Sequence, residues 1–425
     1  MYNLTYPVHK CSCSIDISCV RACIIIGKGE LKNEKDSCYH SGLCHHRNYA
    51  GCGGSGSTAA PAAAEKVVKI GVFEPASGDS ASGGKKETLG MQYANAETPT
   101  VEINGETYKV ELVMADNGSS TDKAPSAASQ LVSEGVALVL GSYGSGVSMA
   151  GGPAFEQAGI AAIGVTCTNP NVTAGNDYYF RICFLDPFQG TVLANFAMDK
   201  FSAKKAYLLG ETGNEYDQGL IAFFKQAFEA AGGEVITDSF PKNNSDFTSY
   251  LNKAKSENVD VIFTPVSIAY ATQIIAQMTS LGIECPLVGP DTLDDNMVLE
   301  AAKGKDLELY VSTFYQEGGS PEFDAAIKKY INENSAALTA NGGNDTISAV
   351  TAMGYDAYYL ALEAMKAAGS VEGADIKAAL PDVTYTGVSG AIAFDDIGDA
   401  IRDTAYIKHA TNDGGWELET TQKAG

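Results

Sequence analysis

Hydroxyl-bearing residues follow two apolar runs in the stretch from Val136 to Thr173, in a pattern that suits anion binding. The residues of the two turns are Ser142, Tyr143, Gly144 and Ser145, and then Thr166, Cys167 and Thr168. A turn that follows a parallel strand and opens a helix offers unpaired N–H groups and the positive end of the helix dipole. We therefore expect the first turn to bind an anion such as a carboxylate. We expect the second to add a hydroxyl, an N–H group and outward-facing carbonyls.

The elements that must position these turns alternate between strand and helix from Lys66 onward. Predicted strands include 66–73, 108–116, 180–184, 205–210, 259–265, 286–291 and 309–314, with helices between them. Alternation of this kind indicates parallel sheets, and the same order of elements occurs twice, which indicates two similar lobes. Predicted helices at about 321–333, 349–368 and near 375, and a hairpin of 388–396 with 403–410, are too few for a third domain. They must add to the two lobes.

Length and charge narrow the class of protein. A chain of 425 residues is long for one hydrophobic core and suggests two domains. Its 29 Lys and Arg against 52 Asp and Glu give a net charge of −23, which argues against nucleic acid or anionic lipid as a partner. We find no apolar run long enough for a transmembrane helix.

The first 52 residues differ in composition from the rest, holding seven of ten cysteines and four of five histidines. Their spacing does not match common zinc-site patterns. Ala50-Gly51-Cys52, followed by small residues, resembles the lipobox and tether of a bacterial lipoprotein, although the apolar core of a signal peptide is missing and Tyr49 is unusual there. We therefore interpret 1–51 as an atypical leader outside the mature structure, Cys52 as a lipidation site and 52–65 as a flexible tether.

From Lys66 to about Glu417 the chain resembles the periplasmic binding proteins of branched-chain amino acid uptake, the leucine/isoleucine/valine-binding type. The residues that carry the resemblance are KIGVFEPASGD, GSYGSGVSMA, VTCTNPNVT, YFRICFLDPFQG, NEYDQGL, GPDTLDD and GYDAYYLALEAM. The resemblance implies an α/β fold of two doubly wound parallel-sheet lobes joined by three crossovers, near Asp186, Phe314 and Asp399. Lobe 1 would comprise 66–186 with 315–398, and lobe 2 would comprise 187–314 with 399–425.

The resemblance also implies ligand-binding roles. Ser145 and Thr168 would bind the carboxylate of an amino acid, and the Cys167 carbonyl would face its ammonium group. Tyr216 would close over the ligand from the second lobe, and Asp291 would pair with the ammonium. As alternatives, Asp291 caps the following helix and Tyr216 is a packing residue.

The side-chain end of the pocket is where this chain departs from the family pattern. Gly83 and Ser267 stand at about the places where branched-chain receptors carry bulky aromatics. The residues that could line the pocket instead are Tyr143, Tyr270, Phe314 and Tyr355, beside Gly144 of the first turn. We therefore expect a small amino acid, branched-chain or other, or a related carboxylate.

Cys167 and Cys183 lie beside the predicted site. In an exported protein they could form a disulfide, and the alternative is two buried free thiols. Cys285 has no evident partner.

By this resemblance the protein is an extracellular, lipid-anchored or periplasmic receptor that delivers its ligand to an ABC permease. We expect a monomer with no cofactor, no metal, no nucleic acid and no membrane contact beyond the anchor. One alternative is a sensor module of the same fold for another small carboxylate or amide. A serine hydrolase using Ser148 and His409 is more remote, because Ser148 lies inside the predicted helix rather than at the turn.

Overall fold

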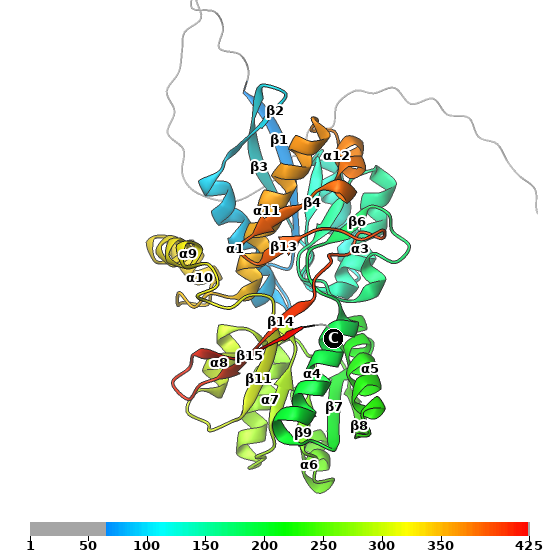
Figure 1. Cartoon of the computed structure of the whole chain (residues 1–425), viewed down its shortest axis with the longest axis vertical. Helices are drawn as coiled ribbons and strands as arrows, with labels where there is room; N and C mark the ends of the chain where they lie inside the picture. The colour runs from blue at the N-terminus through cyan, green and yellow to red at the C-terminus, as the bar shows by residue number, and fades with distance from the viewer. Residues whose placement is uncertain (1–64, 424–425) are drawn as a thin grey trace, which may run out of the picture. The chain divides into compact units, whose positions relative to one another are not determined.

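Two mostly parallel β-sheets organise residues 65–423, the part of the chain that the computed structural model describes (Figure 1). The first sheet has the strand order β2–β3–β1–β4–β5–β6. Only β2 runs antiparallel to its neighbour. Its strands are β1 (Lys66–Glu74), β2 (Thr100–Ile103), β3 (Glu106–Asp116), β4 (Leu138–Leu140), β5 (Ala162–Gly164) and β6 (Tyr179–Arg181).

The second sheet has the order β15–β14–β11–β10–β9–β7–β8. Its strands are β7 (Lys205–Glu211), β8 (Glu234–Phe240), β9 (Val261–Phe263), β10 (Leu287–Gly289), β11 (Leu309–Thr313), β14 (Thr404–Ala410) and β15 (Trp416–Lys423). The first five are parallel, while β14 and β15 continue the sheet in antiparallel fashion. A small ribbon of β12 (Tyr385–Gly387) and β13 (Gly390–Ile392) stands apart from both sheets.

Helices connect the strands and cover the sheets. They are α1 (Ala81–Glu97), α2 (Ala124–Ser133), α3 (Ser145–Ala158), α4 (Asp186–Phe201), α5 (Glu215–Ala230), α6 (Thr248–Ser256), α7 (Ile268–Ser280), α8 (Asn296–Ala302), α9 (Pro321–Glu333), α10 (Ser335–Ala340), α11 (Ala349–Ala368) and α12 (Gly373–Ala379). Local signals set several of their ends. Pro321 starts α9, where its missing N–H costs nothing, and Gly369 ends α11 with φ +61°.

The two faces of the first sheet pack into different apolar clusters because side chains alternate along each strand. Leu138 and Leu140 of β4 belong to the large core that contains α1 and α11, which lie side by side. Val139, between them, packs in a smaller cluster with Phe73 and Phe155 of α3. Helices α1 and α11 thus lie on one face and α2 and α3 on the other. Because α3 follows the parallel strand β4 in the chain, it begins at the edge of the sheet where the carboxyl ends of the strands lie.

The chain passes between the sheets three times. It leaves the first sheet after β6 through α4, returns after β11 to α9–α11, and crosses again before β14. Helix α11 packs against α1 and against β2 and β4, so it belongs with the first sheet. The predicted fold class is confirmed.

Several details differ from the sequence-based expectations. The predicted hairpin of 388–396 with 403–410 is wrong, because β14 pairs with β11 and β15 in the second sheet. Phe394 of the first segment instead forms an isolated bridge with Ala400, which precedes the second segment. Strands β2, β12 and β15 and helix α10 were not predicted. The leader, the tether up to residue 64 and the lipidation site Cys52 lie outside the described residues, and within 65–423 no helix is long and apolar enough to cross a membrane.

Candidate ligand-binding site

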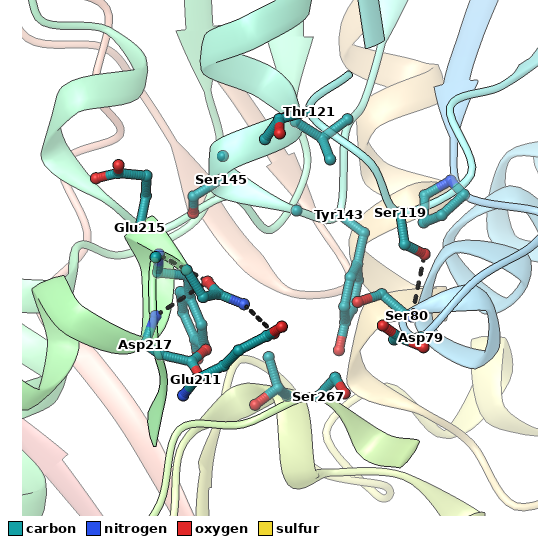
Figure 2. Close-up of a pocket in the computed structure, with 18 of the residues that line it drawn as sticks. Asp79, Ser80, Ser119, Thr121, Tyr143, Ser145, Glu211, Glu215, Asp217 and Ser267 are labelled. Carbon is teal, nitrogen blue, oxygen red and sulfur yellow. Dashed lines mark hydrogen bonds between the residues drawn. The ribbon is translucent and has the colours of Figure 1, made fainter. Parts of the chain in front are cut away.

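A cavity of about 170 Å³ lies between the loops that follow the parallel strands of the two sheets (Figure 2). From the first sheet come Pro75, Asp79, Ser80, Ser119, Thr121, Tyr143, Gly144, Ser145, Gly146, Val147 and Thr166. From the second come Glu211, Thr212, Gly213, Asn214, Glu215, Tyr216, Asp217, Lys242, Ser267, Asp291 and Thr292. Ligands of open α/β sheets bind at this edge of the strands, so the cavity is the candidate site.

The start of α3 forms an anion-binding wall of the cavity. Gly144 is the N-cap, and the first amide of the helix to find a partner within it is that of Ser148, which donates to the Gly144 carbonyl. The N–H groups of Ser145, Gly146 and Val147 therefore have no partner within the helix. Ser145 Oγ accepts a hydrogen bond of 3.2 Å from the amide of Asn169, which leaves its hydroxyl proton to donate to a ligand.

Asp291 lies in the opposite wall, two residues after the end of β10. Its Oδ1 accepts hydrogen bonds of 2.7 Å from Gln189 Nε2 of α4 and 2.7 Å from the Tyr216 hydroxyl. Burial raises the pKa of Asp291 to about 6, although both hydrogen bonds act in the opposite direction. The cap of the next helix, α8, is Asp295 rather than Asp291. Asp291 is therefore a buried acid held in place at the cavity, with a polar partner on each side.

Two buried carboxyl groups, those of Glu74 and Glu87, form hydrogen bonds with residues that line the cavity. Glu74 Oε2 accepts a hydrogen bond of 2.8 Å from the Tyr143 amide, and Glu87 accepts one from the Thr166 hydroxyl. Burial and the neighbouring Glu87 raise the pKa of Glu74 well above its usual range. Burial likewise raises the pKa of Glu87 to about 7. Both carboxyl groups therefore keep their protons to a higher pH than exposed glutamates would.

Tyr143 fills the space that a side chain at residue 83 would occupy. A Cβ atom built on Gly83 would lie 2.3 Å from Cε2 of the Tyr143 ring. An aromatic at 83 and the observed Tyr143 therefore exclude each other. The Tyr143 ring, which carries a hydroxyl, therefore occupies the space beside Gly83 and forms this part of the cavity wall.

The structure brings together six of the predicted ligand-binding residues: Tyr143, Gly144, Ser145, Tyr216, Ser267 and Asp291. It does not place Cys167, Thr168 or Tyr270 on the cavity wall. The Cys167 carbonyl accepts a hydrogen bond of 3.0 Å from Arg181 Nη1, so the role expected for it is already taken.

Thr168 and Tyr270 face away from the cavity for different reasons. The Thr168 hydroxyl is buried beside the Asp186 carboxyl at the start of α4. The Tyr270 ring packs edge-on against Phe240 and its hydroxyl accepts from the Asn243 amide. Phe314 and Tyr355 likewise pack against other aromatics, Phe184 and Phe323.

The disulfide considered between Cys167 and Cys183 is absent, because both residues are free, buried cysteines. Cys167 packs in the cluster of Phe155 and Tyr179, on one face of the first sheet. Cys183 packs in the large core with Phe180, on the other face. Burial raises the pKa of the Cys167 thiol to about 12, as expected for an unreactive thiol in apolar surroundings.

The hydrolase arrangement is also contradicted. Ser148 is fully buried within α3, where its Oγ donates to the Gly144 carbonyl and accepts from the Ser142 amide. His409 lies on β14 of the second sheet, next to Glu417 and Glu419. Ser148 therefore makes its hydrogen bonds within the start of α3, and His409 lies beside acids of the second sheet.

Several lining residues were not predicted, notably Glu211, Lys242, Asp79 and Ser119. Glu211 is the last residue of β7, and Lys242 follows β8. The position of a polar residue at the carboxyl end of a parallel strand was the signal that could have identified them. Within residues 65–423 no cluster of His, Cys, Asp and Glu is arranged to bind a metal ion.

The chain matches known proteins over most of the described region. A family model described as periplasmic binding protein matches residues 67–414. A Leu/Ile/Val-binding protein homologue of Brucella suis is 27% identical over 337 residues, which are 78% of this chain and 87% of the relative.

Two solved structures show the same arrangement. A leucine-binding protein of Thermotoga maritima has a TM-score of 0.75 and 30% identity, covering 84% of this chain and 99% of that one. A branched-chain amino acid transporter substrate-binding protein of Streptococcus pneumoniae, solved with isoleucine, has a TM-score of 0.72 and 28% identity, covering 84% and 99%.

Proposed function

The chain belongs to the periplasmic binding protein family, and from that premise we propose that it is the substrate-binding component of an ABC uptake system. The ligand in this proposal is an amino acid, branched-chain or another small one, bound in the cavity between the two sheets. The liganded form then docks on an ABC permease in the membrane. The Streptococcus pneumoniae relative, a transporter component with isoleucine bound, supports both parts of the proposal.

The proposal rests on one observation: groups that favour an anion and a group that favours a cation face each other across the cavity. The start of α3, with the Ser145 hydroxyl, favours an anion, and the buried Asp291 favours a cation. An α-amino acid carries both charges on neighbouring atoms. Because these sites are partly removed from water, a molecule that lacks either charge leaves one of them unpaired and binds weakly.

The two walls also suggest how binding is signalled. The anion-binding wall follows strands of the first sheet, and Asp291 and Tyr216 follow strands of the second. A ligand that contacts both walls stabilises the conformation in which the walls are close. We propose that lobe 1 (66–186 with 315–398) and lobe 2 (187–314 with 399–425) approach in this way.

Export and anchoring through Cys52 remain part of the proposal. A monomer attached by a lipid on Cys52 would present the cavity outside the membrane. Cys52→Ser should release the protein into the medium or periplasm, and mass spectrometry of the native protein should show a lipid on its N-terminal cysteine. Unchanged membrane association of Cys52→Ser would contradict the anchor.

Calorimetric titration of the purified protein with each of the twenty amino acids tests the proposed function. We expect binding of one or a few amino acids, and a loss of at least about tenfold in affinity in Ser145→Ala, because hydrogen bonds to charged groups contribute roughly 1.5–3 kcal/mol. Ser133→Ala, an exposed serine of α2, is the matched control. Binding of simple carboxylates without any α-amino acid would instead support the alternative, a module for another small carboxylate or amide.

A further inference from the structure

We propose that the ligand is an α-amino acid with a carboxamide side chain, and that Glu211 and Lys242 recognise that side chain. This inference rests on the proposed function and deepens it, because it names the class of amino acid. It distinguishes the protein from its named relatives, whose ligands carry branched alkyl groups.

Few of the residues that line the cavity have purely apolar side chains for a branched alkyl group to pack against. Among the lining residues, which all belong to 65–423, only Pro75 and Val147 have wholly hydrocarbon side chains. Ligand pockets for apolar groups are lined mainly by hydrophobic and aromatic side chains. An alkyl group placed here would cover polar groups and leave them without hydrogen bonds, which costs free energy.

Two hydroxyl groups and one carboxyl group line the part of the cavity in which we place the side chain of the ligand. Figure 2 shows Glu211, Tyr143 and Ser267 reaching toward one another across the cavity. Ser267 Oγ is buried and has no hydrogen-bond partner among the described residues. Buried hydroxyl groups in proteins are nearly always hydrogen-bonded, so Ser267 indicates a polar ligand group at this end of the cavity.

Glu211 is a buried carboxylate that lacks a cation. Only 8% of the residue is exposed, and the one hydrogen bond of its side chain within 65–423 is a long one of 3.5 Å from Asn214 Nδ2. None of the ion pairs of the described region includes it. Glutamate is seldom buried without a partner, so Glu211 is positioned to accept a hydrogen bond from the ligand.

Lys242 supplies the complementary donor. It lies two residues beyond β8, the neighbour of β7 in the sheet, and its solvent-exposed side chain lines the cavity together with Glu211. Lys242 also forms no ion pair with residues 65–423. One acceptor and one donor that line the cavity from neighbouring strands match the N–H and C=O groups of a carboxamide. They also carry opposite charges, so a neutral side chain suits them better than a charged one. Asp79 and Glu215 also line the cavity and, unlike Glu211, are solvent-exposed.

The sheet places the two ends of the proposed ligand on different strands. Asp291 lies two residues beyond β10 and Glu211 is the last residue of β7, and β9 lies between these two strands. Two strand spacings correspond to about 10 Å. We therefore expect the ammonium group and the side-chain group of the ligand to be bound at separate points of the cavity.

Calorimetric titration of the full chain with asparagine, glutamine, aspartate, glutamate, leucine, isoleucine and valine tests the inference. We expect asparagine or glutamine to bind at least about tenfold more tightly than the branched-chain amino acids, since each hydrogen bond to a charged group is worth a factor of about ten or more. Lys242→Met should lower the affinity for the carboxamide by about tenfold and leave that for leucine unchanged or higher. Lys225→Met, a half-buried lysine of α5 outside the cavity, is the matched control.

The outcomes separate the inference from the proposed function. Tightest binding of leucine, isoleucine or valine would overturn the inference and leave the proposed function intact. Tightest binding of aspartate or glutamate, or an equal loss for leucine and glutamine in Lys242→Met, would also overturn it. If no α-amino acid binds, the proposed function itself fails.

Discussion

The Tyr216 hydroxyl donates a hydrogen bond of 2.7 Å to Asp291 Oδ1, joining the first turn of α5 to the loop after β10. The same oxygen accepts from Gln189 of α4, the helix through which the chain first crosses between the sheets. Among the described residues both hydrogen bonds end on Oδ1, so Oδ2 is left for a ligand. Asp291 is therefore oriented before the ligand arrives, which lowers the entropic cost of binding.

Asp291→Asn keeps the shape of the side chain and removes its charge. We expect the affinity for the amino acid to fall at least about thirtyfold, because losing one partner of a buried charged pair costs roughly 2–5 kcal/mol. Calorimetric titration measures the change. Asp375→Asn, an exposed residue of α12, controls for a general effect of lost charge. A loss of less than about threefold would show that Asp291 does not pair with the ammonium group.

Binding should weaken in acid. Burial raises the pKa of Asp291 to about 6 in the free protein, whereas the ammonium group of the ligand needs the ionised carboxylate. Below pH 6 binding must first remove a proton from Asp291, so affinity should fall up to about tenfold per pH unit. Titrations between pH 5 and pH 8 measure this slope. It should vanish in Asp291→Asn, and a slope that persists there would assign the effect to another group.

Lys86 forms a buried ion pair with Asp295, and only 1% of the lysine side chain and 3% of the aspartate side chain are exposed. Lys86 lies on α1, which packs on the first sheet, and Asp295 caps α8, which packs on α7. Lys86→Met should lower the free energy of unfolding by roughly 3–5 kcal/mol, because Asp295 is left buried and unpaired. Urea denaturation measures the loss.

The double variant Lys86→Met/Asp295→Asn provides the internal check on this pair. It should be more stable than the sum of the two single changes predicts, because neither charge is then left alone. Lys328→Met, which breaks the exposed pair with Glu317, should cost less than about 1 kcal/mol. Additive losses would mean that the two side chains act independently.

The Glu74–Glu87 pair should make stability fall as pH rises. Burial raises the pKa of Glu87 from 4.5 to about 7, so between these values the folded protein holds more protons than the unfolded chain. Stability conferred by that proton is complete below the lower value and is lost as pH rises through the higher one. In Glu87→Gln this loss should disappear, giving a flatter dependence of the free energy of unfolding between pH 5 and pH 8.

Urea denaturation at several pH values measures the difference between Glu87→Gln and the parent protein. Relative to the parent, the variant should gain up to about 3 kcal/mol on going from pH 5 to pH 8. Glu322→Gln, an exposed residue of α9, should follow the parent curve. Parallel curves for Glu87→Gln and the parent would contradict the raised pKa.

Much of the fold followed from local patterns in the sequence. Helices α9 and α11 lie where they were predicted, because their apolar periodicity and their end signals, such as Pro321 and Gly369, are local. The same holds for Ser145 at the start of α3 and for Asp291 after β10. Each position follows from an apolar strand and the turn behind it, and parallel strands bring such turns to one edge.

Only the tertiary structure decided which distant segments of the chain pair with each other. Lys86 meets Asp295 across 209 residues of sequence, and β14 joins β11 instead of forming the expected hairpin. Neighbouring residues diverge in the same way: Thr166 lines the cavity, whereas Thr168 turns toward Asp186. Which side chain faces the ligand depends on packing against elements far along the chain. The sequence alone determined where the binding loops begin, and the folded arrangement determined which of their groups meet the ligand.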